Sequence, residues 1–155
     1  MGLMKRAIYG ALGGLGGTIA LTGLRQGLAS VGLVQTSAPE QVVDRLDELG
    51  LTDDWSPEAH RALAVAAHLA YGVGMGAVLG LLRRRRGGVS EEAAVGSALG
   101  LLAWGAGWST WLPLAGVHEP PWEQETPRVL LPVLDHAVFG AVWALIYRAQ
   151  RREPV

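Results

Sequence analysis

Four long apolar segments alternate with polar stretches along this chain of 155 residues. The segments cover approximately residues 7–27, 59–82, 93–114 and 129–147. Each is close to the roughly 20 apolar residues that a helix needs to cross the hydrocarbon core of a bilayer. The pattern therefore predicts an all-α polytopic membrane protein, with four transmembrane helices in one domain that spans residues 1–155.

The polar stretch between the first two segments, residues 35–58, contains a shorter helical pattern. Its apolar positions recur at helical spacing with acidic residues opposite them, and Gly50 is a helix stop signal. The apolar positions are Val42, Val43, Leu46 and Leu49. The pattern predicts a short external amphipathic helix that lies on the membrane surface or caps the bundle.

Composition supports a membrane protein and excludes several kinds of site. Half of the residues are hydrophobic and only 17% are charged, whereas soluble domains carry about a quarter of charged residues. The chain has no cysteine, which excludes disulfides, thiolate metal ligands and cysteine nucleophiles. The formal net charge of −1 gives no overall attraction to nucleic acid.

Basic residues set the expected orientation in the membrane. Lys5 and Arg6 precede the first segment, residues 83–86 are all arginine and follow the second, and Arg148, Arg151 and Arg152 follow the fourth. Because cytoplasmic loops are enriched in Lys and Arg, both termini and the turn at residues 83–90 are expected in the cytoplasm. The N-terminal pattern also resembles a secretory signal, but its long glycine-dense run favours a retained helix.

Glycines recur at four-residue spacing in three of the segments and predict close helix packing. In lipid, helices associate through close backbone approach, which spaced small residues allow. The predicted packing residues are Gly10, Gly14, Gly17, Gly72, Gly76, Gly80, Gly96, Gly100 and Gly140, and Gly23 and Gly27 form a further spaced pair. The same spacing suits packing within one chain, a homo-oligomer or a partner membrane subunit.

The second and fourth segments share an internal repeat. His68, Tyr71 and Gly72 have the same spacing as His136, Phe139 and Gly140. The four segments are therefore predicted to be two duplicated helical hairpins. The repeated helices run in the same direction, related by a pseudo-two-fold axis along the membrane normal. At 1.5 Å per residue, both histidines are expected roughly 10–15 Å below the outer surface.

The repeated histidines define a candidate polar site within the membrane. Its residues are His68, His136, Asp135, Arg25 and Tyr71. The histidines could each bond a helix carbonyl and lock the bundle, or they could relay protons or a small solute with Asp135. They could also ligate a haem, but two histidines fall short of a zinc site, so no metal site is predicted without haem.

Arg25 is the other charge within an apolar segment. Its long side chain can snorkel to the membrane surface, which we favour, or it can pair with Asp135 from the fourth segment. These alternatives place the guanidinium group in different surroundings.

No sequence motif indicates catalysis. The chain lacks a phosphate-binding glycine loop after a strand and a serine nucleophile motif, and the glycines of the first segment have no accompanying strand. We therefore expect a non-enzymatic integral membrane protein without a cofactor, acting as a scaffold or accessory subunit held by glycine packing. The alternatives are a small transporter or proton-conducting bundle that uses His68, His136 and Asp135, and a bis-histidine haem-binding electron carrier.

Several stretches resemble the YagU-like family of small bacterial inner-membrane proteins. They are the glycine-rich first segment, APEQVVDRL (38–46), HLAYGVGMG (68–76), WGAGWSTWLPLAG (104–116) and HAVFG (136–140). The resemblance covers most of the chain and implies a four-helix, multi-pass protein of the bacterial inner membrane. It transfers no catalytic residue.

Overall fold

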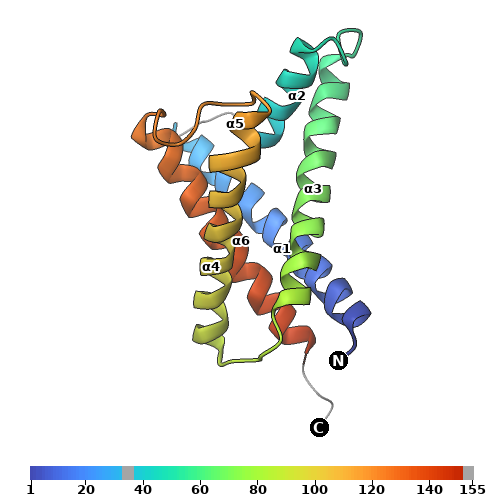
Figure 1. The fold of residues 1–155 in the computed structure, drawn as a ribbon, viewed down its shortest axis with the longest axis vertical. Helices are drawn as coiled ribbons and strands as arrows, with labels where there is room; N and C mark the ends of the chain where they lie inside the picture. The colour runs from blue at the N-terminus through green and yellow to red at the C-terminus, as the bar shows by residue number, and fades with distance from the viewer. Residues whose placement is uncertain (33–36, 152–155) are drawn as a thin grey trace.

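The computed structural model describes residues 1–32 and 37–151, and within these ranges the regular structure is entirely helical. The long helices are α1 (Leu3–Ser30), α3 (Pro57–Leu82), α4 (Val89–Ala106) and α6 (Thr126–Gln150). The shorter elements are α2 (Ala38–Glu48), the π-helix η1 (Gly107–Trp111) and α5 (Leu112–Leu114). Figure 1 shows the long helices as one bundle, with α2 and α5 at the end away from both termini. The all-α prediction is confirmed for these residues; the first two residues of the predicted 35–58 loop lie outside the described ranges.

Three helices are long and apolar enough to cross a membrane: α1, α3 and the part of α6 from Arg128 to Gln150. The helix α4 is not among them. It has 18 residues, carries Glu91 and Glu92 in its first turn, and passes into the π-helix at Gly107. The fourth transmembrane span therefore stays a prediction.

The helix α2 lies where the amphipathic helix is predicted, and its start is capped. The Ser37 side chain accepts a hydrogen bond from the backbone N–H of Glu40, and the Glu40 carboxylate accepts one from the backbone N–H of Ser37. This reciprocal capping box satisfies two N–H groups that a helix start leaves free. The apolar side of α2 buries Val43, and the helix packs on α3.

The long helices pack in a defined order. The helix α1 packs along α3, α4 packs along α6, and α1 also packs along α6. No comparable packing joins α3 to α4, both of which are fully described. Each predicted hairpin therefore has its two helices in contact, while the duplication itself stays a prediction.

Glycines line the contact between α1 and α3. A methyl group on Gly14 would overlap the carbonyl oxygen of Gly72, and one on Gly10 would overlap that of Gly76. A methyl group on Gly80 would lie 2.8 Å from Cα of Gly10. Only glycine allows the two backbones to come this close.

Close contacts at glycines also join α6 to α4 and to α1. Methyl groups on Gly96 and Gly100 would overlap the carbonyl oxygens of Gly140 and His136. On α1, a methyl group on Gly17 would lie 2.8 Å from the Phe139 ring. By contrast, a methyl group on Gly23 or Gly27 would meet no described atom within 4 Å, so neither position is closely packed against another helix in the described chain.

Large aromatic side chains fill the bundle near the chain termini. Trp143 and Tyr147 are fully buried and stack with ring centroids 5.4 Å apart. The Trp143 indole N–H donates to the carbonyl of Gly76 at 3.2 Å, and the Tyr147 hydroxyl donates to that of Gly80 at 2.8 Å. The aromatic cluster thus bonds α6 directly to the backbone of α3.

Arginines satisfy the carbonyl groups at the end of α3 and in the turn after it. The last carbonyls of a helix have no partner within the helix. The buried Arg6 donates to the carbonyls of Gly80 and Leu81. Beyond the helix end, Arg148 donates to the carbonyl of Gly87 at 3.0 Å, and Arg151 donates to the carbonyls of residues 84 and 85.

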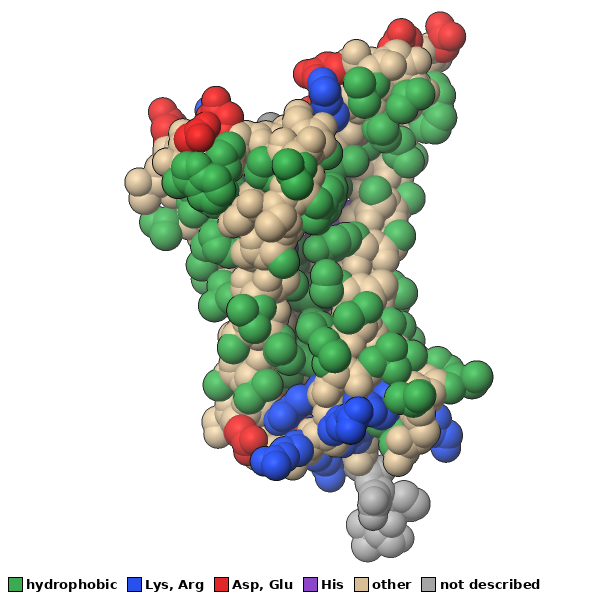
Figure 2. Space-filling model, in the orientation of Figure 1, with side chains coloured by type: hydrophobic (Ala, Val, Ile, Leu, Met, Phe, Trp, Pro, Cys, Tyr) green, Lys and Arg blue, Asp and Glu red, His purple; other side chains and the backbone are tan. Residues whose placement is uncertain are grey.

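Charge is distributed unequally between the two ends of the bundle. Lys and Arg gather at the end that carries the termini, and most Asp and Glu lie at the end with α2 (Figure 2). We call these the basic end and the acidic end. Within the basic end, Arg83 makes two 3.1 Å hydrogen bonds to the buried carboxylate of Glu92.

Candidate ligand-binding cavity

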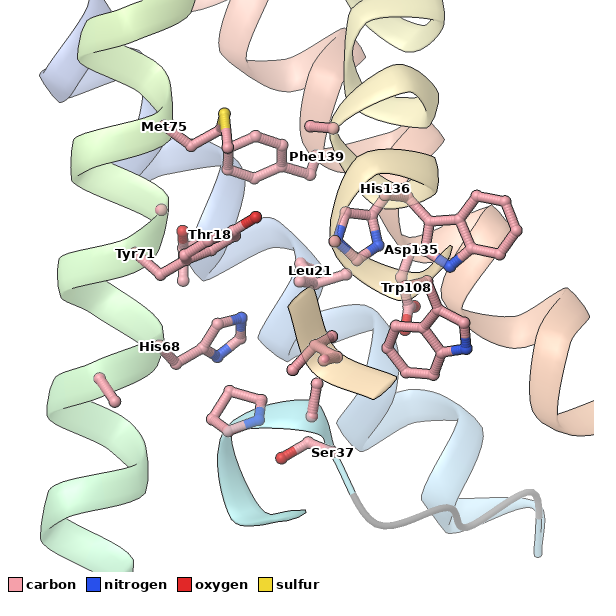
Figure 3. A pocket seen from close by; sticks show the side chains of 18 of the residues that line it. Thr18, Leu21, Ser37, His68, Tyr71, Met75, Trp108, Asp135, His136 and Phe139 are labelled. Carbon is pink, nitrogen blue, oxygen red and sulfur yellow. The ribbon is translucent and has the colours of Figure 1, made fainter. Parts of the chain in front are cut away.

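A cavity of about 200 Å³ lies in the acidic half of the bundle. Its walls come from α1, α3, α6 and the end of α4 with the π-helix, and the first turn of α2 covers it. Figure 3 shows side chains from these elements converging on this space. We call it the main cavity.

Aromatic side chains form much of the cavity wall. They are Tyr71, Trp104, Trp108, Trp111 and Phe139. Trp108 is held in place by two contacts, since its ring lies 4.3 Å from that of His118 and its indole N–H donates to Gln124 at 3.3 Å. The wall on the α4 side is therefore fixed to the acidic-end loop.

The π-helix carries two of these tryptophans, Trp108 and Trp111. Pro113 follows the π-helix by two residues; it has no N–H, and its ring opposes the carbonyl of Ser109. Regular α-helical bonding therefore cannot continue unchanged at this point. Short π-helical turns are frequent at functional sites.

His68 projects from α3 toward the cavity (Figure 3). Within the described chain, neither of its ring nitrogens has a hydrogen-bond partner. The histidine therefore does not lock α3 to another helix. Its nitrogens remain available to a molecule in the cavity.

His136 reaches the same cavity from α6. Its Nδ1 lies 2.8 Å from the carbonyl oxygen of Pro132, one turn earlier in the same helix. Because a carbonyl only accepts, Nδ1 carries the proton, and in the neutral ring Nε2 is left with a free lone pair. This bond lies within α6, so it joins no two helices.

Asp135 pairs with Arg25 across the α1–α6 contact. Arg25 Nε donates to Asp135 Oδ2 at 2.6 Å, and the exposed fractions of the two side chains are 24% and 2%. Of the two arrangements considered for Arg25, the structure has the ion pair rather than snorkelling. The other carboxylate oxygen, Oδ1, is buried without a hydrogen-bond partner in the described chain.

A second cavity, of about 360 Å³, lies beside the first. Arg25, His68 and Asp135 line both spaces. The ion pair and the free imidazole thus stand between two cavities. The second cavity is also lined by Arg61, Gln26 and Glu40, so it is the more polar of the two.

No family model, curated protein or solved structure matches the chain.

The structure brings all five predicted polar residues to the main cavity. It also adds residues that were not predicted: Met75, Trp104, Trp108 and Phe139. The spacing of Trp104, Trp108 and Trp111 along one helix face was the available signal. Among the described residues, no three His, Cys, Asp or Glu side chains could together hold a metal ion.

The cavity is closed toward the basic end. Phe139 and Met75 border it, and beyond them Leu79, Trp143 and Tyr147 form the aliphatic and aromatic core. Neither cavity is lined by Trp143 or Tyr147. The arrangement is that of a pocket, hollow at one end of the bundle and filled at the other.

Proposed function

We propose that this chain is a non-enzymatic, four-span protein of the bacterial inner membrane that binds a small, mainly apolar ligand in the main cavity. The observation that carries the proposal is the cavity itself, with its mainly apolar wall that includes five aromatic side chains and with a few converging polar groups. Ligand sites are commonly concave and mostly apolar, with a small number of polar groups that orient the ligand. A scaffold that acts by glycine packing alone has no use for this space.

Several features support the membrane assignment. Three helices have the required length and hydropathy, and helical structure continues from α4 through the π-helix to Leu114, which gives a fourth element of similar length. The charge asymmetry favours a cytoplasmic basic end and an external acidic end. The paired packing of α1 with α3 and α4 with α6 favours the duplicated hairpins, and the sequence resemblance favours the YagU-like family.

The gap between α3 and α4 supports access from the membrane. These helices do not pack along each other, and Figure 2 shows a hollow between the two columns of the bundle. Tyr71 and Trp111 line the cavity yet are 42% and 45% exposed, so they lie at its rim. In a bilayer this opening would face lipid chains, which favours a ligand that dissolves in the membrane.

The filled basic half weighs against a conducting path. A transporter or proton channel needs a route to both sides, whereas the stacked Trp143 and Tyr147 fill the bundle below the cavity. The cavity volumes also weigh against a bis-histidine haem. Drug-sized ligands occupy pockets of about 300–1,000 Å³, the main cavity has about 200 Å³, and the second cavity, of about 360 Å³, is lined by His68 but not by His136.

The orientation is testable with single cysteines, because the natural chain has none. Ser56 and Ser90 are both exposed and lie at opposite ends of the bundle. With a membrane-impermeant maleimide on cells whose outer membrane has been permeabilised, Ser56→Cys should be labelled. Ser90→Cys should be labelled only after the inner membrane is lysed, and the reverse pattern would overturn the proposed orientation.

Ligand binding is testable with bromobenzene, an apolar aromatic probe whose bromine quenches nearby tryptophans. We expect saturable quenching of the purified protein in detergent, because Trp104, Trp108 and Trp111 line the cavity. Ala67→Leu should abolish it by filling the cavity. Its matched control is Ala66→Leu, since Ala67 lines the cavity and the adjacent Ala66 is exposed. Equal quenching in both variants would assign the signal to probe dissolved in detergent and would contradict the proposal.

A further inference from the structure

Two buried polar groups at the main cavity lack partners, and they are of opposite kinds. Asp135 Oδ1 is a hydrogen-bond acceptor, and the Trp104 indole N–H is a donor; both are buried without a protein partner in the described chain. Both residues line the main cavity. A buried polar group without a partner is unfavourable, so a ligand that pairs with either one gains affinity.

The histidines add further acceptor capacity at the same site. His136 Nε2 has a free lone pair when Nδ1 donates to Pro132, and His68 has no hydrogen-bond partner among the described residues. A bound ammonium group could form hydrogen bonds only with the protein acceptors, and a bound carbonyl group only with the protein donors. A hydroxyl group serves both, because it donates one hydrogen bond and accepts others.

Charge at the site favours a neutral ligand. Arg25 and Asp135 are opposite charges already paired at 2.6 Å, so the pair leaves no net charge for a ligand to balance. A charged ligand would lose its hydration on entering a mainly apolar cavity without a counter-ion.

The wall also selects for shape. Trp108 and Phe139 are buried, and Tyr71 lies opposite them on α3 (Figure 3). Aromatic side chains stack favourably on other rings, and a cavity of about 200 Å³ suits one substituted ring better than a large ring system.

We propose that the main cavity binds the hydroxylated aromatic ring of a phenol- or quinol-type compound. This inference rests on the proposed function, since it names the ligand class of the same cavity. The ring lies among the aromatic side chains, and its hydroxyl donates to Asp135 Oδ1 and accepts from the Trp104 N–H. Any apolar tail leaves through the opening between α3 and α4.

The test compares three probes of nearly equal size by calorimetric titration of the purified protein in detergent. They are trimethylphenol, its methyl ether, and tetramethylbenzene. The ether keeps the oxygen but cannot donate, and the hydrocarbon can do neither. Because hydrogen bonds to charged groups are the strong ones, we expect the phenol to bind roughly tenfold or more tightly than the other two.

Two variants check which protein groups cause this preference. Trp104→Phe keeps a ring but removes the N–H, and we expect it to weaken phenol binding severalfold more than it weakens hydrocarbon binding, which loses only part of the wall. The double variant Arg25→Met/Asp135→Leu removes the acceptor without leaving a lone charge, and we expect it to abolish the preference for phenol over ether. A preference for phenol over ether that is retained in the double variant, or equal losses of phenol and hydrocarbon affinity in Trp104→Phe, would overturn the inference.

The outcomes separate this inference from the proposed function. If none of the probes binds, the proposed binding function fails. If all three bind with equal affinity, the cavity is a binding site but its ligand is not selected by a hydroxyl group, and the inference fails alone.

A prenylated phenol distinguishes a membrane lipid from a free aromatic compound. If the prenylated phenol binds at least tenfold more tightly than trimethylphenol in the same detergent, the natural ligand is a membrane lipid with an apolar tail. Equal affinity would identify a free phenol and would overturn the tail exit between α3 and α4.

Discussion

The basic and acidic halves of the bundle are built in different ways from the same four long helices. In the basic half, glycines bring the backbones into contact, and the stacked Trp143 and Tyr147 fill the remaining space. In the acidic half, α1 carries Gly23 and Gly27, where an added methyl group would meet no described atom within 4 Å, and the helices border two cavities. The difference indicates that close packing holds the basic half together, whereas the acidic half keeps open space and polar groups without partners in the described chain.

The ion pair of the acidic half should give the largest effect on stability. Asp135→Ala leaves the Arg25 guanidinium partly buried without its counter-ion, and breaking a buried pair from one side costs about 3–5 kcal/mol. We expect a correspondingly lower midpoint of thermal unfolding, followed by circular dichroism in detergent. The double variant Arg25→Met/Asp135→Leu should recover most of this loss. If the double variant is as unstable as the single one, the two residues do not act as a pair.

Two glycines on one helix test the comparison directly. Gly10→Ala places a methyl group against the Gly76 carbonyl oxygen in the basic half, and overpacking of this kind costs about 1–3 kcal/mol. Gly23→Ala meets no atom in the acidic half, so it should be neutral or should stabilise α1 through its higher helix propensity. Thermal unfolding of both variants checks this. Equal destabilisation would show that the halves are packed alike.

Acid should weaken the basic half first through Glu92, which lies in the first turn of α4, ahead of its apolar part. Burial by itself raises the pKa of Glu92, but hydrogen bonds from Arg83 and from the Gly87 N–H outweigh it, so the pKa lies below its ordinary value of 4.5. Because the pKa is lowered in the folded chain, the ionised carboxylate stabilises the fold at pH values above the ordinary pKa of 4.5. This contribution is lost as the pH falls from 4.5 through the lowered pKa. The loss should be about 1.5 kcal/mol, the lower range for a hydrogen bond to a charged group.

The pH effect has a matched control in the neighbouring residue. Glu92→Gln should flatten the dependence of unfolding temperature on pH between about 5 and 3, whereas Glu91→Gln, whose side chain is 61% exposed, should keep it. An unchanged pH profile in Glu92→Gln would place the acid-sensitive group elsewhere.

Much of the fold could be predicted from the sequence because apolar runs and helix-start signals are local. The Ser37 and Ser56 caps follow this logic, since each serine accepts a hydrogen bond at the start of its helix. The repeat likewise placed His68 and His136 at one depth, and both line the main cavity. Residue spacing within a helix determines which side chains share one face.

The cavity could not be predicted because it depends on distances between helices. Its volume results from how far α3 and α4 stand apart, and no residue spacing encodes this separation. The pairing of Arg25 with Asp135 could be named only as an alternative to snorkelling, because the two residues are 110 positions apart along the chain and a long flexible side chain has several partners within reach. The π-helix at Gly107–Trp111 also departs from the regular α-helical pattern on which the sequence argument rests.

The arginines at the basic end serve two purposes with one chemical group. Under the proposed orientation they are the sorting signal that the insertion machinery recognises by charge, and lysine would serve that purpose equally well. Arg6 and Arg151, however, each donate from two different nitrogens to two carbonyl groups at or beyond the end of α3. The planar fork of a guanidinium group spaces these donors apart, whereas lysine has a single nitrogen. Exchange of these arginines for lysine would therefore leave the membrane topology intact while it loosens the basic end of the bundle. Membrane topology and the packing of this end can thus change independently.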